Sequence, residues 1–214
     1  MWRKIAVAVI VVAGLCLTGF AQEEGAARFG IGIKAGTPGA GVELSMPFTS
    51  NFGGRLGFNY FTYSYDTTQE GIDYDADLTL LSIAALIDWH PTGGSFRVSG
   101  GVIYNGNEVE GKASGDLKIG ETEYTDVKAK AKVDFDDIAP YVGIGWDTSF
   151  GAERQWGFIC DIGVIYHGTP NVSFTATGTV IDPADVQEEK KKLEDNIEDF
   201  RFYPVITLGL IYKF

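Results

Sequence analysis

The chain has 214 residues, of which 45% are hydrophobic and 13% aromatic, and 28 of them are glycine. Its 29 acidic residues outnumber the 17 basic ones and give a net charge of −12, so we expect no nucleic-acid partner. The length fits a single domain, and the glycine and aromatic content favours strands over helices.

Residues 1–21 have the pattern of a secretory signal peptide. Arg3 and Lys4 precede a short apolar run, and small residues occupy the positions before the expected cleavage point. The alternative is an uncleaved membrane anchor, but the run is shorter than the ~20 residues that a spanning helix prefers. We therefore expect one domain over 22–214, with a net charge of 15 − 29 = −14 and a single cysteine, Cys160.

Eight segments of this domain alternate apolar with polar or small residues at a period of two, which predicts β-strands. They cover 28–36, 40–48, 54–66, 72–90, 95–107, 138–150, 156–168 and the segment that ends at Phe214. The turns after the second, fourth and sixth strands are short, whereas the long connections, 108–137 and 169–199, both lie on the opposite side. This asymmetry is typical of bacterial outer-membrane barrels.

Each strand has one apolar face and one face that carries charges and glycines. In the strand over 156–168, for example, Phe158 and Ile162 share one face while Asp161 and Gly163 share the other. A soluble lipocalin-like barrel, the alternative, would turn its aliphatic face inward and its charges outward. The pattern instead predicts an all-β, eight-stranded, antiparallel up-and-down transmembrane β-barrel, with a short helix in the last extracellular loop.

Aromatic residues cluster at the strand ends, where a membrane barrel carries its interfacial girdles. The girdle beside the short turns is expected to contain Trp89, Trp146, Trp156, Phe48, Phe96 and Phe150. The opposite girdle is expected to contain Tyr60, Tyr104 and Tyr166.

With these features the chain resembles the small eight-stranded outer-membrane proteins, a group that includes the OmpA membrane domain, OmpX, OmpW and the opacity proteins. The runs DYDADL, LIDWHP and RVSGGVIYNG are also similar to a group of outer-membrane barrels without an assigned function. The resemblance implies a location in the bacterial outer membrane, with its lipid and lipopolysaccharide as partners.

The ending PVITLGLIYKF resembles the signal by which the barrel assembly machinery recognises such proteins, which implies that machinery as a further partner. The residues that fit the signal are Phe214, Tyr212, Leu210 and Leu208.

Strand parity predicts a network of charged residues inside the barrel. Its members are Lys34, Glu43, Arg55, Asp88, Arg97, Asp147 and Asp161. The hairpin between the fourth and fifth strands should place Asp88 nearly opposite Arg97. Because an eight-stranded lumen is barely wide enough for its own side chains, we interpret this network as a plug. The alternative is a gate for small solutes, or a small-ligand site.

Asp73, Asp75 and Asp77 lie on one face of a strand, above the expected membrane boundary. The simpler interpretation is a hydrated extension of the strand. The alternative is a weak site for a divalent cation that bridges to lipopolysaccharide phosphates, although this spacing is not that of a calcium loop. We expect no cofactor and no dedicated metal centre.

The two histidines offer little for catalysis. His90 is expected to be a polar interfacial residue, and His167 a hydrogen-bonding residue at the outer rim. A lipid A-modifying enzyme is the alternative, with His167 as base and Thr169 as nucleophile, but no carboxylate is placed to orient the histidine. We therefore predict that the protein is not an enzyme.

The two long connections contain further elements. The alternation in VKAKAKVDF predicts that the fifth and sixth strands extend beyond the membrane as a ribbon. In the last loop, Asp182, Pro183 and Asp185 predict the start of a helix. Its apolar side would comprise Val186, Leu193, Ile197 and Phe200. We predict a lid across the barrel mouth, the alternative being a partner-binding surface.

The predicted function is accordingly that of a structural or surface-interaction barrel in a Gram-negative outer membrane.

Overall fold

The structure, a computed structural model, describes residues 29–69, 71–178 and 181–214. The predicted signal peptide lies outside these residues. Eight strands form the barrel: β1 (Gly30–Gly36), β2 (Gly39–Pro47), β3 (Phe52–Gln69), β4 (Ile72–Trp89), β5 (Phe96–Asn105), β8 (Ile138–Asp147), β9 (Trp156–Tyr166) and β11 (Phe202–Lys213). The remaining elements are β6 (Glu108–Ile119), β7 (Thr122–Asp134), β10 (Asn171–Thr177) and α2 (Pro183–Ile197). None of the helices in the described ranges is both long and apolar enough to cross a membrane.

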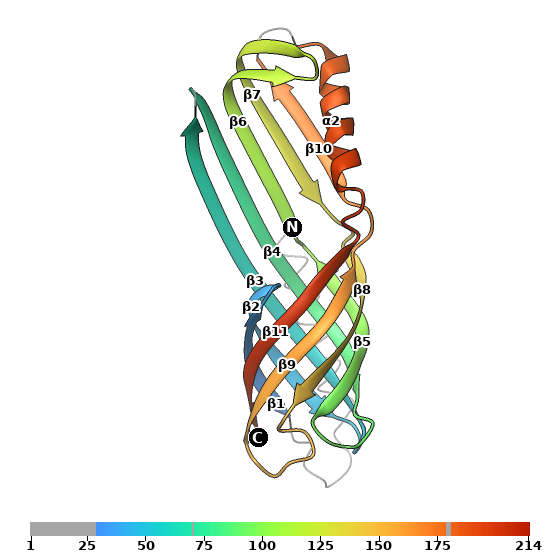
Figure 1. Cartoon of the computed structure of the whole chain (residues 1–214). Coiled ribbons are helices and arrows are strands. Elements are labelled where there is room, and N and C mark those ends of the chain that lie inside the picture. The colour runs from blue at the N-terminus through green and yellow to red at the C-terminus, as the bar shows by residue number, and fades with distance from the viewer. Residues whose placement is uncertain (1–28, 70, 179–180) are drawn as a thin grey trace, which may run out of the picture.

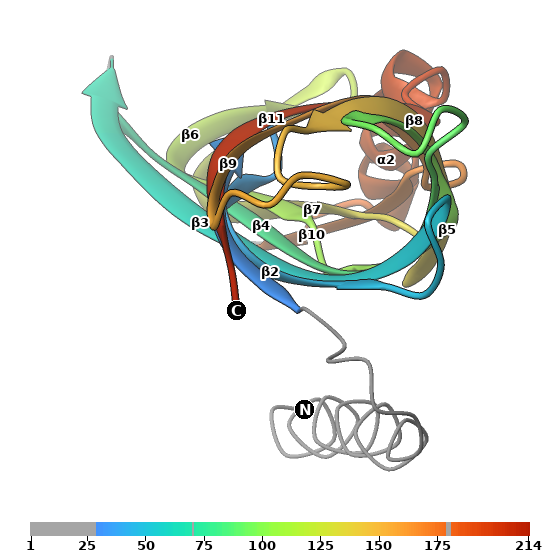
Figure 2. The same cartoon turned by 90° about the horizontal axis from the view of Figure 1, so that it is seen from below.

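The barrel closes because each of its eight strands pairs antiparallel with two neighbours. The order around the ring is β1, β2, β3, β4, β5, β8, β9 and β11, and β11 returns to β1 with Gly30 opposite Lys213. Figure 1 shows the barrel from the side, and Figure 2 shows the closed ring from below. The predicted eight-stranded antiparallel barrel is confirmed.

The outside of the barrel is an apolar belt. Phe158 is 70% exposed and Leu208 is 65% exposed, although both are large hydrophobic residues in regular strands. The inward positions of the same strands hold buried charges such as Asp161. Apolar side chains outside and charged ones inside are the arrangement of a barrel that spans a membrane, and they contradict the soluble lipocalin-like alternative.

The glycines of the inner face make room for bulky lumen side chains, as the sequence pattern indicated. Tyr141 on β8 lies beside Gly163 of the neighbouring strand β9. A Cβ atom added to Gly163 would lie 2.5 Å from the Tyr141 hydroxyl oxygen, well inside contact distance.

The girdle beside the short turns is present, with one correction. Trp89, Trp146 and Trp156 are exposed at that end of the barrel. Phe150, however, turns inward and stacks on His90, with ring centroids 3.4 Å apart. Both residues lie in turns, where the alternation of a strand no longer fixes the side-chain direction, so their predicted interfacial positions are wrong.

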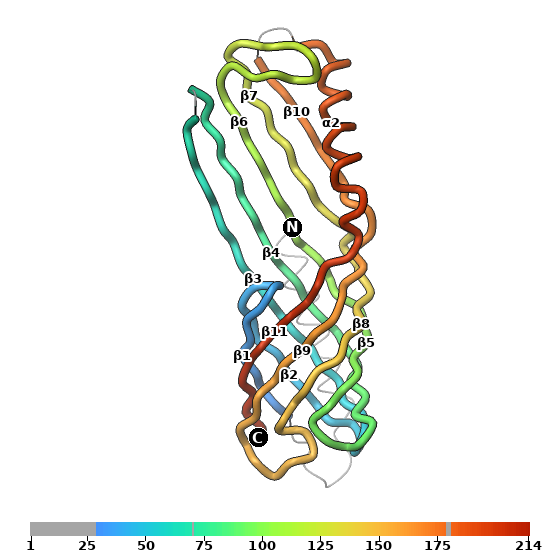
Figure 3. Tube along the Cα trace, in the orientation of Figure 1, coloured from blue at the N-terminus to red at the C-terminus, as the bar shows by residue number. Residues whose placement is uncertain are grey.

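Beyond the barrel, five strands form a tall open sheet on one side, here called the outer sheet: the outer parts of β3 and β4 (61–69 and 72–81) with β6, β7 and β10. Strand β6 continues β5 along β4 in an unbroken register, since Ser82 pairs with Asn105 and Thr79 with Glu108. Strand β7 pairs with β6 and leads into β8, so the predicted ribbon is confirmed. Figure 3 shows β3 and β4 rising past the turn between β1 and β2.

Helix α2 begins as predicted but does not form a lid. Asp182 is its N-cap, with a side chain that accepts from the backbone N–H of Ala184, and Pro183 opens the helix. The helix stands beside β10, along the long axis of the molecule, rather than across the barrel mouth (Figure 1). The hydroxyl of Tyr124 on β7 donates to Asp185 at 2.7 Å and holds the first turn of the helix to the outer sheet.

Candidate functional site

The seven predicted lumen charges come from seven different strands and all point into the barrel. The exposure of each of their side chains is 8% or less. With Lys34, Arg55 and Arg97 positive and the four carboxylates negative, the formal charge of the set is 3 − 4 = −1. The strand alternation thus brings nearly balanced charges together in a space from which water is largely excluded.

Arg55 of β3 is the centre of this network. Its Nε lies 2.7 Å from Asp88 Oδ2, and its Nη2 donates to Asp88 Oδ1 at 3.1 Å. Its Nη1 donates to Asp161 Oδ2 at 2.9 Å and to Glu43 Oε2 at 3.4 Å. Its Nη2 also donates to Ser99 Oγ at 3.1 Å. One guanidinium therefore joins side chains of β2, β4, β5 and β9 across the lumen.

Arg97 of β5 forms the second centre, mainly with Asp161. Its Nε and Nη2 donate to Asp161 Oδ1 at 3.3 and 3.0 Å, and Nη2 also reaches Asp161 Oδ2 at 3.1 Å. Its Nη1 lies 3.9 Å from both Asp88 Oδ2 and Asp147 Oδ2, which is beyond hydrogen-bond distance. Thr207 of β11 completes the ring of strands by donating to Asp161 Oδ2 at 3.3 Å.

The predicted contact between Asp88 and Arg97 is therefore a secondary one. The strand register places Ser99, not Arg97, opposite Asp88, and Ser99 Oγ donates to Asp88 Oδ1. The turn between β4 and β5 is longer than the four residues 91–94 expected from the sequence, and the resulting register places Arg97 opposite Gly145 of β8, which in turn lies opposite Asp161 of β9.

The remaining charges lie at the two ends of the network. Lys34 Nζ donates to Glu43 Oε2 at 2.9 Å on the outer side. On the side of the short turns, Asp147 Oδ1 accepts from the backbone N–H of Ser149 at 2.8 Å and from its hydroxyl at 2.6 Å.

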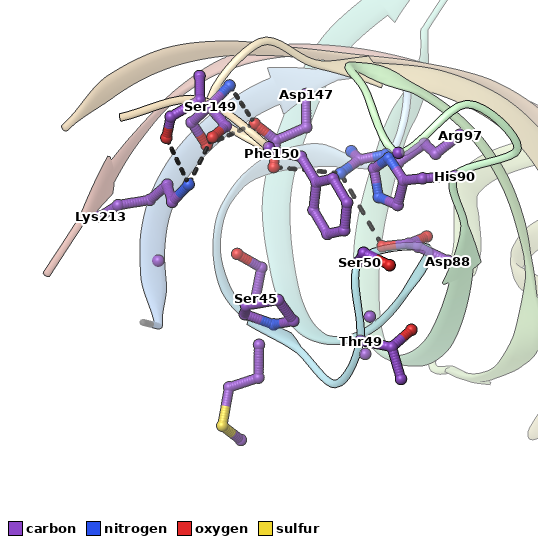
Figure 4. Close-up of a pocket in the computed structure, with 18 of the residues that line it drawn as sticks. Ser45, Thr49, Ser50, Asp88, His90, Arg97, Asp147, Ser149, Phe150 and Lys213 are labelled. Atoms are coloured by element: carbon purple, nitrogen blue, oxygen red, sulfur yellow. Dashed lines mark hydrogen bonds and ion pairs between the residues drawn. The ribbon is translucent and has the colours of Figure 1, made fainter. Parts of the chain in front are cut away.

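Below the network, the lumen opens into a cavity of 470 Å³ at the end of the short turns, here called the vestibule. Figure 4 shows Asp88, Arg97 and Asp147 at its inner end, with His90 and Phe150 beside them. Lys213 lines another part of the vestibule, where its Nζ donates to the backbone carbonyls of Ser149 and Ala152. Above the network, a cavity of only 30 Å³ remains, about the volume of one water molecule. The charge network thus separates two spaces of very different size.

The network includes polar residues that the sequence analysis did not single out. Ser99 and Thr207 occupy inward positions of their strands, so the same parity rule that found the charges could have found them. The vestibule residues Ser149 and Phe150 lie in a turn, where no periodic signal exists.

The three aspartates proposed as a weak cation site lie along the outer face of β4. They occupy alternate residues of the strand and therefore form a row rather than a cluster. Hydroxyl groups of β3 already donate hydrogen bonds to two of them: Ser64 to Asp77, and Thr68 to Asp73. Lys112 Nζ lies 3.7 Å from Asp77. Within the described parts of the chain, no group of three or more metal-ligating side chains is gathered.

The histidine considered for catalysis is buried at the junction of barrel and outer sheet. The His167 ring stacks on Phe135 with centroids 4.0 Å apart, and it is only 3% exposed. Thr169 is exposed, and neither ring nitrogen of His167 has a hydrogen-bond partner among the described residues. The geometry thus offers no base and nucleophile in contact.

His90 makes the stability of the short-turn end depend on pH. Burial lowers the pKa of His90 below its ordinary value. Since the unfolded chain then takes up a proton more readily than the folded one, the contribution of His90 is full above about pH 6.5 and falls as the pH drops below it. We expect the free energy of unfolding to decrease less between pH 7.5 and 5.5 in His90→Gln than in the unmodified protein. Equal pH dependence of the two proteins would contradict this.

No protein-family model matches the sequence, and no curated protein matches it. Among solved structures, CarO2 of Acinetobacter baumannii matches with a TM-score of 0.60 and 21% identity, covering 88% of this chain and 99% of that one. CarO of Acinetobacter baumannii matches with a TM-score of 0.58 and 23% identity, covering 86% and 97%. A major outer membrane protein of Thermus thermophilus gives a TM-score of 0.48 and 15% identity over 89% and 100%. The chain therefore shares the β-barrel fold of the two Acinetobacter proteins.

Proposed function

We propose that this protein is an outer-membrane barrel with a structural or surface-interaction role, that its charge network closes the lumen, and that its outer sheet carries the specificity. The apolar belt, the aromatic girdle and the asymmetry between short and long connections support the location. The exposed ending Leu208, Leu210 and Phe214 supports delivery by the barrel assembly machinery, and the belt implies contact with outer-membrane lipid and lipopolysaccharide.

The proposal that the lumen is closed rests on one observation: the contacts of the two arginines extend across the lumen. Arg55 and Arg97 between them contact carboxylates of β2, β4, β8 and β9 within 4 Å. A solute that crossed this layer would have to separate buried ion pairs, and each unpaired charge would be costly in so dry a space.

Conductance across a planar bilayer tests this proposal. We expect neither the refolded protein nor its Arg97→Ala variant to show discrete openings at the same salt, because Arg55 still bridges the lumen in the variant. Folding is checked by the heat-dependent shift of the protein in gel electrophoresis. Regular openings of the unmodified protein would overturn the closed lumen.

A gate for small solutes is the second candidate. Arg97 lines the vestibule, and its Nη1 lies 3.9 Å from two carboxylates, so a polar solute that accepts a hydrogen bond would compete for this group. A gate predicts openings in the unmodified protein that become larger or more frequent in Arg97→Ala. The same recordings therefore distinguish the two candidates.

A further inference from the structure

The outer part of β3 is an open edge of the sheet. Pairing with β2 stops where Ala40 meets Tyr60, whereas pairing with β4 continues to Gln69 opposite Ile72. Residues 61–69 therefore have a partner strand on one side, and no strand of the described residues pairs with them on the other. Figure 3 shows this part of β3 standing clear above the turn between β1 and β2.

The register identifies the backbone groups at this edge. The N–H of Gly106 donates to the carbonyl of Leu81, so Leu81 directs its backbone groups away from β3. Because this direction alternates along a strand, Leu80 directs its groups towards β3, where its register partner is Phe61. The residues that present N–H and C=O groups to the open edge are consequently Thr62, Ser64, Asp66 and Thr68.

Apart from the single charge of Asp66, this edge lacks the usual protection against strand addition. Natural sheets protect their edges with charged side chains, lysine above all, or with proline, bulges or a covering helix. The run FTYSYDTTQ over 61–69 contains no lysine or proline, and its pairing with β4 is regular throughout. At the opposite side of the outer sheet, α2 stands beside β10 (Figure 1).

The two faces of the edge strand differ in chemistry. Phe61, Tyr63 and Tyr65 share the face that continues the barrel interior, and they are 44%, 56% and 53% exposed. Large aromatic side chains so exposed in a regular strand form an apolar surface without a cover. The side chains of the four edge-presenting residues, all polar, share the opposite face.

That polar face is acidic. Asp66 stands directly opposite Asp75 in the register, and Asp73 and Asp77 flank Asp75 on the same face of β4. Like charges in direct cross-strand contact repel each other. Lys112 pairs in register with Asp75 on the side away from β3, where its Nζ lies 3.7 Å from Asp77, so the side next to the open edge is left with negative charge.

We propose that this edge of β3 binds an extended peptide as an additional strand, and that the peptide alternates apolar and basic residues. The four edge residues supply the main-chain hydrogen bonds. The apolar side chains of the peptide lie against Phe61, Tyr63 and Tyr65, and its basic side chains lie beside Asp66 on the acidic face. Strand addition of this kind takes its affinity from the main chain and its selectivity from alternate side chains. The inference does not depend on whether the lumen conducts.

Hydrogen exchange of the full refolded protein in micelles tests the proposal directly. The probe is a nine-residue peptide that alternates valine and lysine. On its addition, we expect the amide hydrogens of Thr62, Ser64, Asp66 and Thr68 to exchange at least about tenfold more slowly, while those of Phe61 and Tyr63, already bonded to β4, change little. Binding without protection of these four amides would overturn strand addition.

Two controls test the backbone and the charges separately. Thr62→Pro removes one edge N–H without touching the pairing with β4, and we expect it to weaken peptide binding about fivefold or more relative to Thr62→Val. A peptide with glutamate in place of lysine should bind at least about tenfold more weakly, and Asp66→Asn should reduce that difference. Equal binding of both peptides would overturn the basic preference. Concentration-dependent protection of the edge without any peptide would mean that the edge pairs with a second copy, and would overturn the peptide as occupant.

Discussion

Replacing Arg55 by alanine is expected to lower the free energy of unfolding by about 3–5 kcal/mol, because it leaves buried carboxylates without their main counter-ion. Among the described residues, Asp88 would keep Ser99 and a distant Arg97 as partners, and Glu43 would keep Lys34. Urea unfolding of the refolded protein in lipid vesicles, followed by tryptophan fluorescence, measures the change.

Arg154→Ala is the matched control for this experiment. Arg154 is exposed in the turn before β9, so its loss removes the same charge without leaving a buried partner. We expect a change within about 0.5 kcal/mol. If Arg55→Ala were no less stable than this control, the network would not hold the barrel together. Arg55→Met tests whether filling the space without the charge restores any stability.

An arginine introduced in the middle of the apolar belt should lower the stability of the protein nearly as much as the loss of Arg55. We expect Ile162→Arg to destabilise the folded protein by about 2–4 kcal/mol in vesicles, since Ile162 points outward from the middle of β9. The loss of stability arises from placing a charge among the lipid chains, so it should depend on how deep in the membrane the residue lies. Urea titration in the same vesicles measures this difference.

The control for the belt prediction is an arginine at the end of the same strand. Tyr166 ends β9 and also faces outward, but it lies at the edge of the belt. Tyr166→Arg should therefore cost only about 0–1 kcal/mol beyond the loss of the tyrosine ring. Equal costs at both positions would contradict the placement of the membrane along the barrel.

Strand alternation allowed most of the barrel to be predicted from the sequence. A period of two fixes which side chains face inward, so Arg55 and Asp161 could be placed in the lumen without knowledge of their partners. Alternation does not fix how far one strand slides along the next. For this reason, the sequence pattern predicted a pair between Arg97 and Asp88, whereas in the structure Arg97 bonds mainly to Asp161.

Turns and loop helices were predicted less well, for a different physical reason. The start of α2 depends on local capping by Asp182 and was predicted correctly. The site where the helix docks depends on contacts with distant residues such as Tyr124, which local signals do not contain. His90 and Phe150 lie in turns and stack on each other inside the vestibule, because two turns far apart in the sequence meet there.

The distribution of the network along the chain has a consequence for the order of folding. Strands β1 to β5 carry all three of its cations and two of its four carboxylates, while Asp147 and Asp161 follow in β8 and β9. Closure requires β1 to meet β11, which joins residues near opposite ends of the described chain, and such long-range contacts form late. A partly assembled sheet therefore holds an excess of positive charge on its inner face. Asp147 and Asp161 change the charge of the network from 3 − 2 = +1 to 3 − 4 = −1, so electrostatic attraction as well as strand pairing draws the later strands into the closing barrel.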